Sequence, residues 1–305
     1  MEQPQLLPYY APANTLPAAL PTAQEMIALI QRDRDRMQDT SKIVVIKPPF
    51  VIKFGFNVHL QEGQNMMMIK QHTDVPVPTV YALFQFNLMN FIVMEYIPGS
   101  DLRQCWETLT ADEKADILRQ LRVYFAKIRA MPSPGYYGGI GRQPIRDLLM
   151  TLPPPGLSLE FLDLPRRIVP PCSTEGMWVS KMTDVLEERA PGMDLFQLRL
   201  RMYPLFDSVF RGHRSVFTHA NITLSSIMRG HDGTIYMLDW AQAGWYPSCW
   251  EYCRLLAAPV YPAEFQTPGF LNPFPAELAV VLKMRNMVYP NLNRDTFEDM
   301  LRRYQ

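Results

Sequence analysis

The sequence predicts an α+β fold, with a small strand-rich lobe of about 95 residues followed by a larger, mostly helical lobe. Two observations lead to this prediction. Short apolar runs of strand length gather in the first third of the chain, at residues 43–46, 50–54, 80–86 and 90–97. After residue 110 the apolar residues recur mostly at helical spacing. Because 48% of the 305 residues are hydrophobic, the chain can fill a core, which argues against global disorder.

The N-terminal elements follow from local signals. Residues 1–21 contain five prolines and no periodic pattern, which predicts an extended arm. Thr22 and Glu25 have the spacing of a capping box, which begins a helix. Residues 61–71 predict a second helix, ended by the Val-Pro-Val-Pro run that follows. We therefore divide this part of the chain into the arm and an N-terminal lobe over residues 22–97.

The helical C-terminal lobe is assigned to residues 98–305. Residues 110–113 have a second capping-box pattern, and helical spacing returns over residues 174–211. Short strands around a His-Asp-Gly-Thr turn predict a hairpin region at residues 216–240. From Gly244 onward we expect helices interrupted by prolines.

Charge and cysteine content argue against several classes of protein. The 30 Lys and Arg residues balance 30 Asp and Glu residues, which argues against nucleic acid or an acidic membrane surface as the main partner. No stretch approaches the roughly 18 consecutive apolar residues of a membrane span. Four cysteines are too few for a secreted disulfide scaffold, and no signal-peptide pattern is visible. We expect a cytoplasmic protein.

Two charged residues near the start of the chain could bind phosphate. Lys53 lies in the middle of an apolar strand, where a single lysine most often faces solvent. Glu62 follows nine residues later at the start of a helix, where it also suits the helix dipole. Together they could form the ion pair that aims a lysine at nucleotide phosphates.

Two further candidates lie near the predicted hairpin. His219 is on a polar loop before the hairpin, and Asp239 directly follows its last strand. Such loops often carry catalytic residues, but His219 could also be a buried core histidine and Asp239 a helix cap. This order of features is what a kinase needs. Along the chain it runs from a strand lysine through a helix glutamate, a linker, a histidine loop and a hairpin to an aspartate.

In these segments the chain resembles the aminoglycoside phosphotransferase family, and in particular its fungal branch. The matching segments are Phe-Val-Ile-Lys-Phe-Gly (50–55), Glu-Gly-Gln-Asn-Met (62–66), Thr-Asp-Val-Pro-Val-Pro-Thr-Val-Tyr (73–81), Phe-Ile-Val-Met-Glu-Tyr-Ile-Pro-Gly (91–99), Pro-Gly-Tyr-Tyr-Gly (134–138), Val-Phe-Thr-His (216–219) and Leu-Asp-Trp-Ala-Gln-Ala-Gly-Trp-Tyr-Pro (238–247). The resemblance implies a bilobal protein-kinase-like fold, with an antiparallel sheet in the small lobe. It also implies a small molecule as ligand or substrate, with ATP and Mg²⁺ as cofactors if the protein is an active kinase and no cofactor otherwise.

The resemblance assigns roles to particular residues. The implied cofactor-binding residues are Lys53, Glu62, Met94, Glu95, Tyr96 and Ile97. Lys53 would contact the nucleotide phosphates, Glu62 would orient Lys53, and residues 95–97 would form the hinge that faces adenine. Asp239 would hold Mg²⁺ between the phosphates.

The predicted catalytic loop departs from the family pattern. Family members read His-Gly-Asp-Leu, three variable residues and Asn, whereas this chain reads His-Ala-Asn-Ile-Thr-Leu-Ser-Ser over residues 219–226. Asn221 therefore stands in place of the catalytic aspartate, and Ser226 in place of a metal-binding asparagine. We take His219, Asn221 and Asp239 as catalytic candidates, and Asp239 and Ser226 as metal ligands. Because an amide cannot accept the proton of an acceptor hydroxyl, we expect a loss of ~10²–10⁴ in rate.

Glycine is absent before Gly55, which excludes a Gly-rich phosphate loop in the first fifty residues. We expect the turn Lys47-Pro48-Pro49 to lie where a Gly-rich loop would cover the nucleotide. The two prolines remove two N–H donors, so the turn would weaken binding of the phosphates.

Several functions remain open at this point. A pseudokinase, or a kinase fold repurposed to act on a small metabolite, fits the altered loop, and fungal secondary metabolism is one expected setting. The alternative is an active ATP- and Mg²⁺-dependent small-molecule phosphotransferase in which Asn221 only positions the acceptor hydroxyl. A third hypothesis is a plain α+β binding domain with accidental motif matches.

Overall fold

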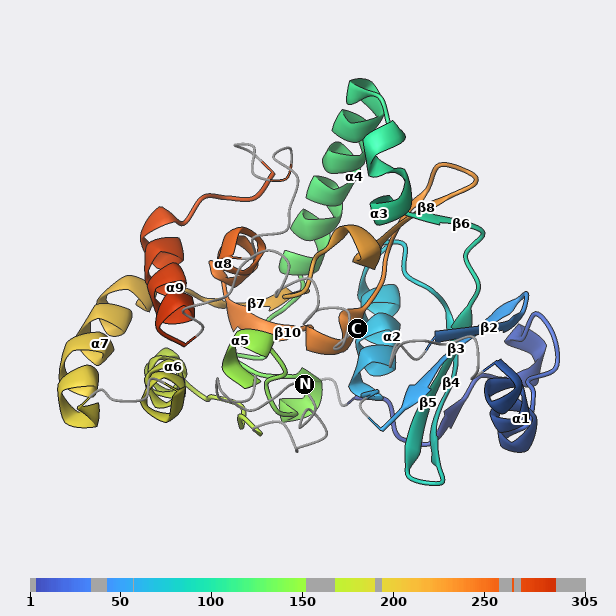
Figure 1. Cartoon of the computed structure of the whole chain (residues 1–305), viewed down its shortest axis with the longest axis horizontal. Helices are drawn as coiled ribbons and strands as arrows, with labels where there is room; N and C mark the ends of the chain where they lie inside the picture. The colour runs from blue at the N-terminus through green and yellow to red at the C-terminus, as the bar shows by residue number, and fades with distance from the viewer. Residues whose placement is uncertain are drawn as a thin grey trace. The chain divides into compact units, whose positions relative to one another are not determined.

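A computed structural model describes residues 4–33, 43–56, 58–151, 168–189, 194–257, 265 and 270–288. The fold is α+β, as predicted, with an antiparallel sheet in the N-terminal region and mostly helices after it (Figure 1). The chain divides into two compact units. The sheet unit holds the described residues up to Leu109 together with Leu224–Ala241, and the helical unit holds Thr110–Thr223 and the described residues from Gln242. Of the predicted hairpin region 216–240, residues 224–240 therefore fall in the sheet unit and residues 216–223 in the helical unit.

The sheet unit is built on five antiparallel strands in the order β1-β4-β5-β3-β2. Their bounds are β1 Tyr9–Tyr10, β2 Ile43–Lys47, β3 Phe50–Gly55, β4 Val80–Phe86 and β5 Met89–Glu95. The four strands predicted from apolar runs are present. The N-terminal arm, in contrast, is not wholly irregular, because it supplies β1 and a 3-10 turn at Ala13–Thr15.

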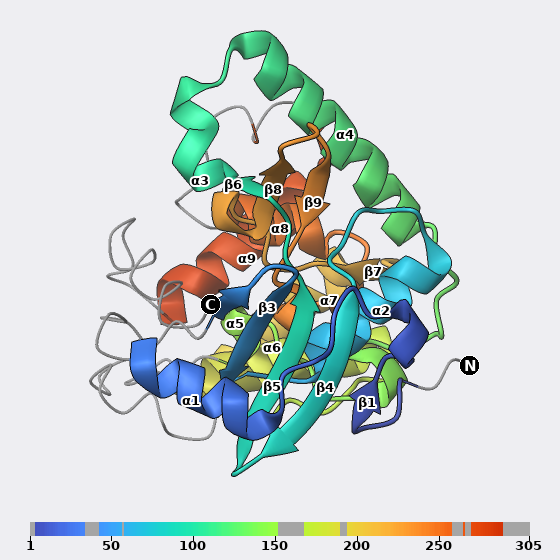
Figure 2. The same cartoon turned by 90° about the vertical axis from the view of Figure 1, so that its right-hand side faces the viewer.

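Two helices, α1 (Ala23–Asp33) and α2 (Gln61–His72), pack on opposite faces of this sheet (Figures 1 and 2). Side chains that alternate along β3 explain why one face of the sheet is apolar and the other carries Lys53. Phe50, Ile52 and Phe54 join a buried cluster with Met26 of α1. Because side chains alternate along a strand, Lys53 projects to the other face. The predicted capping box between Thr22 and Glu25 is present at the start of α1.

A second, three-stranded sheet completes this unit. It consists of β6 (Gly99–Asp101), β8 (Ile227–Gly230) and β9 (Ile235–Met237), in the order β6-β8-β9. The short helix α3 (Leu102–Cys105) follows β6 and is capped by the side chain of Asp101. The hairpin predicted from the His-Asp-Gly-Thr turn is therefore present, and it brings Asp239 into the unit that holds Lys53.

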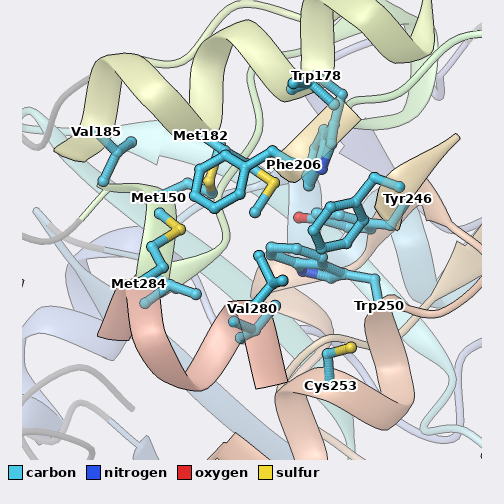
Figure 3. Close-up of a cluster of buried hydrophobic side chains, with 14 of the residues drawn as sticks. Met150, Trp178, Met182, Val185, Phe206, Tyr246, Trp250, Cys253, Val280 and Met284 are labelled. Atoms are coloured by element: carbon cyan, nitrogen blue, oxygen red, sulfur yellow. The ribbon is translucent and has the colours of Figure 1, made fainter. Parts of the chain in front are cut away.

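The helical unit contains six described α-helices, and the last five of them contribute to one buried core. They are α4 Ala111–Arg129, α5 Leu148–Thr151, α6 Glu175–Arg189, α7 Leu195–Phe210, α8 Trp250–Ala257 and α9 Pro275–Val288. Figure 3 shows Trp178 of α6, Phe206 of α7 and Trp250 of α8 packed together with Met284 of α9. The capping box predicted at residues 110–113 begins α4.

One prediction for this unit is wrong. Residues 244–247 form the strand β10 (Gly244–Pro247), not a helix, and pair with β7 (Ser215–Thr218). Trp245 lies opposite Phe217, with ring centroids 5.2 Å apart, so an aromatic cross-strand pair stabilises the ladder. Within the described residues, no helix is both long enough and apolar enough to cross a membrane.

Candidate functional site

The sheet unit brings together three of the predicted site residues, Lys53, Glu62 and Asp239. Lys53 Nζ lies 2.9 Å from Glu62 Oε2 and 3.0 Å from Oε1, and it donates to Asp239 Oδ1 at 3.1 Å. The side chains of Lys53 and Glu62 are 7% and 2% exposed, and that of Asp239 is 14% exposed. The expectation of a solvent-facing lysine is wrong, because two carboxylates compensate its charge on the buried face of the sheet.

Electrostatics in this network favour a charged lysine. Burial lowers the pKa of Lys53, but the charges and hydrogen bonds of Glu62 and Asp239 outweigh it, so the pKa lies well above the ordinary lysine range. Burial raises the pKa of Glu62, and the attraction of Lys53 opposes this rise. Since the ammonium group contacts both carboxylates, it is the group that holds the network together.

The segment around Asp239 is fixed by main-chain contacts. Asn65 of α2 donates through Nδ2 to the Trp240 carbonyl at 2.8 Å. The Leu238 N–H donates to the carbonyl of Ser226 at 2.8 Å. Asp239 itself has φ of 60°, in the left-handed region that costs a non-glycine residue energy. The carboxylate is therefore presented by a backbone held on two sides, one of them by the helix that carries Glu62.

Ser226, predicted as a metal ligand, is buried at 1% exposure immediately before β8. Its carbonyl fixes the segment that leads to Asp239, as described above. The neighbouring Ser225 accepts a hydrogen bond from Arg103 at 3.2 Å. The fold therefore constrains the position of Ser226, while its role toward a metal stays a prediction.

The predicted hinge is tied to the sheet at one end. The Glu95 N–H donates to the Thr79 carbonyl at 2.8 Å, and Glu95 Oε2 accepts from the Thr79 hydroxyl at 2.7 Å. The Tyr96 N–H donates to the carbonyl of Pro49 at 2.9 Å. Met94 is partly exposed, and Ile97 is buried at 5% exposure. These contacts order the residues expected to face adenine.

The same contacts correct the interpretation of the Lys47-Pro48-Pro49 turn. Because Pro49 bonds Tyr96, and Phe50 pairs with Glu95, the turn lies at the hinge end of β3. Its prolines therefore do not mark a phosphate cover. Residues 34–42, which precede β2, lie outside the described residues.

His219 and Asn221 belong to the helical unit, in the loop that follows β7. Glu251 of α8 accepts hydrogen bonds from the N–H groups of His219, at 2.7 Å, and Ala220, at 3.1 Å. The Asn221 N–H donates to His219 Nδ1 at 3.2 Å. His219 is fully buried and Asn221 is 5% exposed, so the histidine helps hold the loop that carries the amide.

Glu251 is a residue that sequence reasoning missed. Burial raises the pKa of Glu251 to about 7, although the two N–H groups and the cations Arg129 and Arg254 pull it down. One signal was available, because Glu251 is an acid within the otherwise largely apolar segment Trp250–Ala257. Asn65 was also missed, and its signal was its position one turn after Glu62 on the same helix.

The donor set can be tested against the predicted Mg²⁺. Across the described ranges, no group of three or more His, Cys, Asp or Glu side chains could hold a metal ion. Mg²⁺ in nucleotide sites is commonly held by one or two carboxylates together with phosphate oxygens and water. The single carboxylate of Asp239 therefore fits an ion that arrives with a nucleotide, and it does not fit an ion held by the protein alone.

Comparison with known sequences identifies the family. A profile described as the phosphotransferase enzyme family (APH) matches residues 59–271, which is more than half of the chain. The chain belongs to the phosphotransferase enzyme family. The region matched to this family contains Glu62, Asn221 and Asp239, and Lys53 lies just before it.

Several solved structures resemble this family member. Choline kinase LicA from Streptococcus pneumoniae is 11% identical, with 93% of this chain and 97% of that chain covered and a TM-score of 0.45. A streptomycin–ATP–APH(2″)-IIa ternary complex is 9% identical, with coverage of 93% and 97% and a TM-score of 0.47. Macrolide 2′-phosphotransferase MphH from Brachybacterium faecium is 14% identical, with coverage of 84% and 88% and a TM-score of 0.45. Among curated proteins, no sequence matches this chain significantly.

Proposed function

We propose that this member of the phosphotransferase family is a pseudokinase, or a kinase fold repurposed for a small metabolite. It binds a nucleotide together with Mg²⁺ and a small molecule, and it transfers phosphoryl groups slowly or not at all. One observation carries the proposal. Hydrogen bonds to Glu251 and His219 hold the main chain of the loop that contains His219 and Asn221. At the position of the expected catalytic carboxylate, however, this loop carries the amide of Asn221.

The chemical consequence is the loss of a proton acceptor. The Asn221 amide can accept a hydrogen bond from an acceptor hydroxyl and so position it, but it cannot take the proton. Removal of a general base typically costs ~10²–10⁴ in rate. Ser226 replaces a neutral amide side chain with a shorter, also neutral hydroxyl. Among the predicted metal ligands, Asp239 is the charged group.

The sheet unit supports retained nucleotide binding. A buried ion pair adds little net stability, because the cost of desolvation offsets the attraction. The Lys53–Glu62–Asp239 network is therefore better explained by a ligand than by the stability of the fold. When bound, Mg²⁺ would neutralise phosphate charge at Asp239. Lys53 would hold the phosphates, and Glu62 would keep the ammonium group oriented.

The same network favours a second candidate, an active small-molecule phosphotransferase. Phosphoryl transfer depends mainly on positioning and charge, so the loss of a base slows it without necessarily abolishing it. In this case Asn221 positions the hydroxyl, and solvent or substrate takes the proton. A role beside biosynthetic enzymes of fungal secondary metabolism is the setting that we propose for either candidate.

Melting temperatures test the nucleotide binding that both candidates share, and activity assays separate the two. We expect Mg²⁺–ATP to raise the melting temperature of the parent protein and of Lys283→Met, an exposed control on α9. Lys53→Met should lose the shift. ATPase activity should be at background in the parent and should appear in Asn221→Asp/Ser226→Asn.

Two outcomes would contradict the proposal. Phosphorylated product from the parent, at a rate that Asn221→Asp does not increase, would establish the active enzyme instead. The absence of any nucleotide shift in both the parent and Asn221→Asp/Ser226→Asn would remove nucleotide binding from the proposal.

A further inference from the structure

The N-terminal arm lies in register with Lys53 across the sheet. Tyr9 of β1 is paired with Leu83 of β4, Leu83 with Ile92 of β5, and Ile92 with Lys53 of β3. Residues directly opposite one another in antiparallel strands project to the same face. Tyr9 therefore lies in the same row as Leu83, Ile92 and Lys53, on the face of the sheet that carries the lysine.

Helix α2 contacts this row through two residues and the arm through the residue that follows them. Glu62 pairs with Lys53, as described above. The next residue, Gly63, lies so close to β4 that an added Cβ would meet Leu83 Cδ2 at 2.2 Å. Gln64 then donates through Nε2 to the carbonyl of Gln5 in the arm at 2.6 Å. The helix is thus held at the lysine, at the sheet and at the arm within a single turn.

The arm is itself bound to the sheet edge. The Ala11 N–H donates to the Tyr81 carbonyl at 2.8 Å, and the ring of Tyr10 stacks on Phe84 with centroids 5.7 Å apart. Figure 2 shows β1 beside β4 at the edge of the sheet. The carbonyl that Gln64 reaches is therefore presented by an ordered segment.

The start of α2 lacks a side-chain cap, because Leu60 at its N-cap position provides no side-chain hydrogen bond. The Glu62 N–H donates to the His59 carbonyl at 2.9 Å, and the tertiary contacts of the first turn add to this main-chain bond. Gln64 is only 5% exposed, and a buried amide that lost its acceptor would be unfavourable. Removal of the arm carbonyl would therefore act on the same turn that presents Glu62.

We propose that the arm, residues 4–12, is a strap that positions α2, and that Gln64 is the positioning residue through which it acts. The strap keeps Glu62 at Lys53, so that the ammonium group is aligned before a nucleotide binds. The part of this inference that concerns affinity rests on the nucleotide binding proposed above. The alternative is an arm that only covers the edge of the sheet. In that case, loss of the contact between the arm and Gln64 would leave the geometry of Lys53 and Glu62 unchanged.

The test compares Gln64→Leu and a deletion of residues 1–12 with the parent. Gln71→Leu is the matched control, because it makes the same substitution on an exposed part of α2. Mg²⁺–ATP affinity is measured by calorimetry well below the melting temperature, and amide hydrogen exchange is followed over residues 61–72. We expect Gln64→Leu and the deletion to weaken affinity about 5- to 10-fold and to speed exchange in the first turn of α2. Gln71→Leu should match the parent in both measurements.

A combined variant shows whether the strap acts through Glu62. If it does, Glu62→Gln should lose no further affinity when Gln64→Leu is added, because the two changes disrupt one alignment. Additive losses would overturn this route. If the deleted chain does not fold, Gln64→Leu decides the matter by itself.

Hydrogen exchange keeps this inference separate from the proposed function. A parent protein that does not bind Mg²⁺–ATP contradicts nucleotide binding, and the exchange of α2 then decides whether the strap exists. Exchange in Gln64→Leu equal to that in Gln71→Leu, with only a lower melting temperature, would overturn the strap.

Discussion

The substitution Glu251→Gln removes a buried carboxylate. This carboxylate accepts hydrogen bonds from the main chain of the loop that carries Asn221. Burial raises the pKa of Glu251 from an ordinary value of 4.5 to about 7. Between these pH values the folded chain holds a proton that the unfolded chain has released. The free energy of unfolding therefore falls as pH rises through this window. Since one pKa unit corresponds to about 1.4 kcal/mol, the fall is about 3 kcal/mol.

The assay is urea unfolding of the parent and Glu251→Gln between pH 4.5 and 8, followed by tryptophan fluorescence. At pH 4.5 the two proteins should differ least. By pH 8 the parent should have lost about 3 kcal/mol relative to the variant, because the amide does not titrate. Glu107→Gln, at an exposed glutamate, should follow the parent at every pH. Parallel pH profiles for the parent and Glu251→Gln would refute the reasoning.

Three further predictions concern packing and buried charge. Gly63→Ala places a methyl carbon against the buried Leu83, so we expect a loss of about 1–3 kcal/mol in urea unfolding. Adding Leu83→Ala should give a combined loss smaller than the sum of the two single losses, and strict additivity would contradict the contact. Interactions with the Cys249 thiol and the Glu277 carboxylate raise the pKa of His213 to about 9, against the effect of burial. The stability that this histidine contributes is therefore present below pH 6.5 and is lost as pH rises toward 9. His213→Asn should flatten the melting temperature over this range, and an unchanged pH profile would exclude the effect. Asp147 pairs with Arg254 Nε at 2.8 Å in the core, so Asp147→Asn leaves a buried guanidinium group without its carboxylate, and we expect thermal or urea unfolding to show a loss of about 3–5 kcal/mol. A loss below about 1 kcal/mol, typical of a surface pair, would count against that burial.

Elements with a strong local signal were predictable. The capping box at residues 110–113 and the apolar spacing that follows it define α4, because cap and periodicity both act within one helix. Strand β1 was not predictable, since two residues carry no period and Tyr9 is ordered by pairing with Leu83. Strand β10 was missed for a similar reason, because its partner β7 lies about 29 residues earlier in the chain.

The site divides in the same way. The sequence by itself determined the order of the candidate residues, the neutral side chains at Asn221 and Ser226, and the family to which the chain belongs. Only the tertiary structure decided that Lys53 is buried between two carboxylates, one of them 186 positions away at Asp239. Periodicity and capping depend on neighbours in the chain, whereas the burial and pairing of a charge depend on segments that become neighbours only after folding.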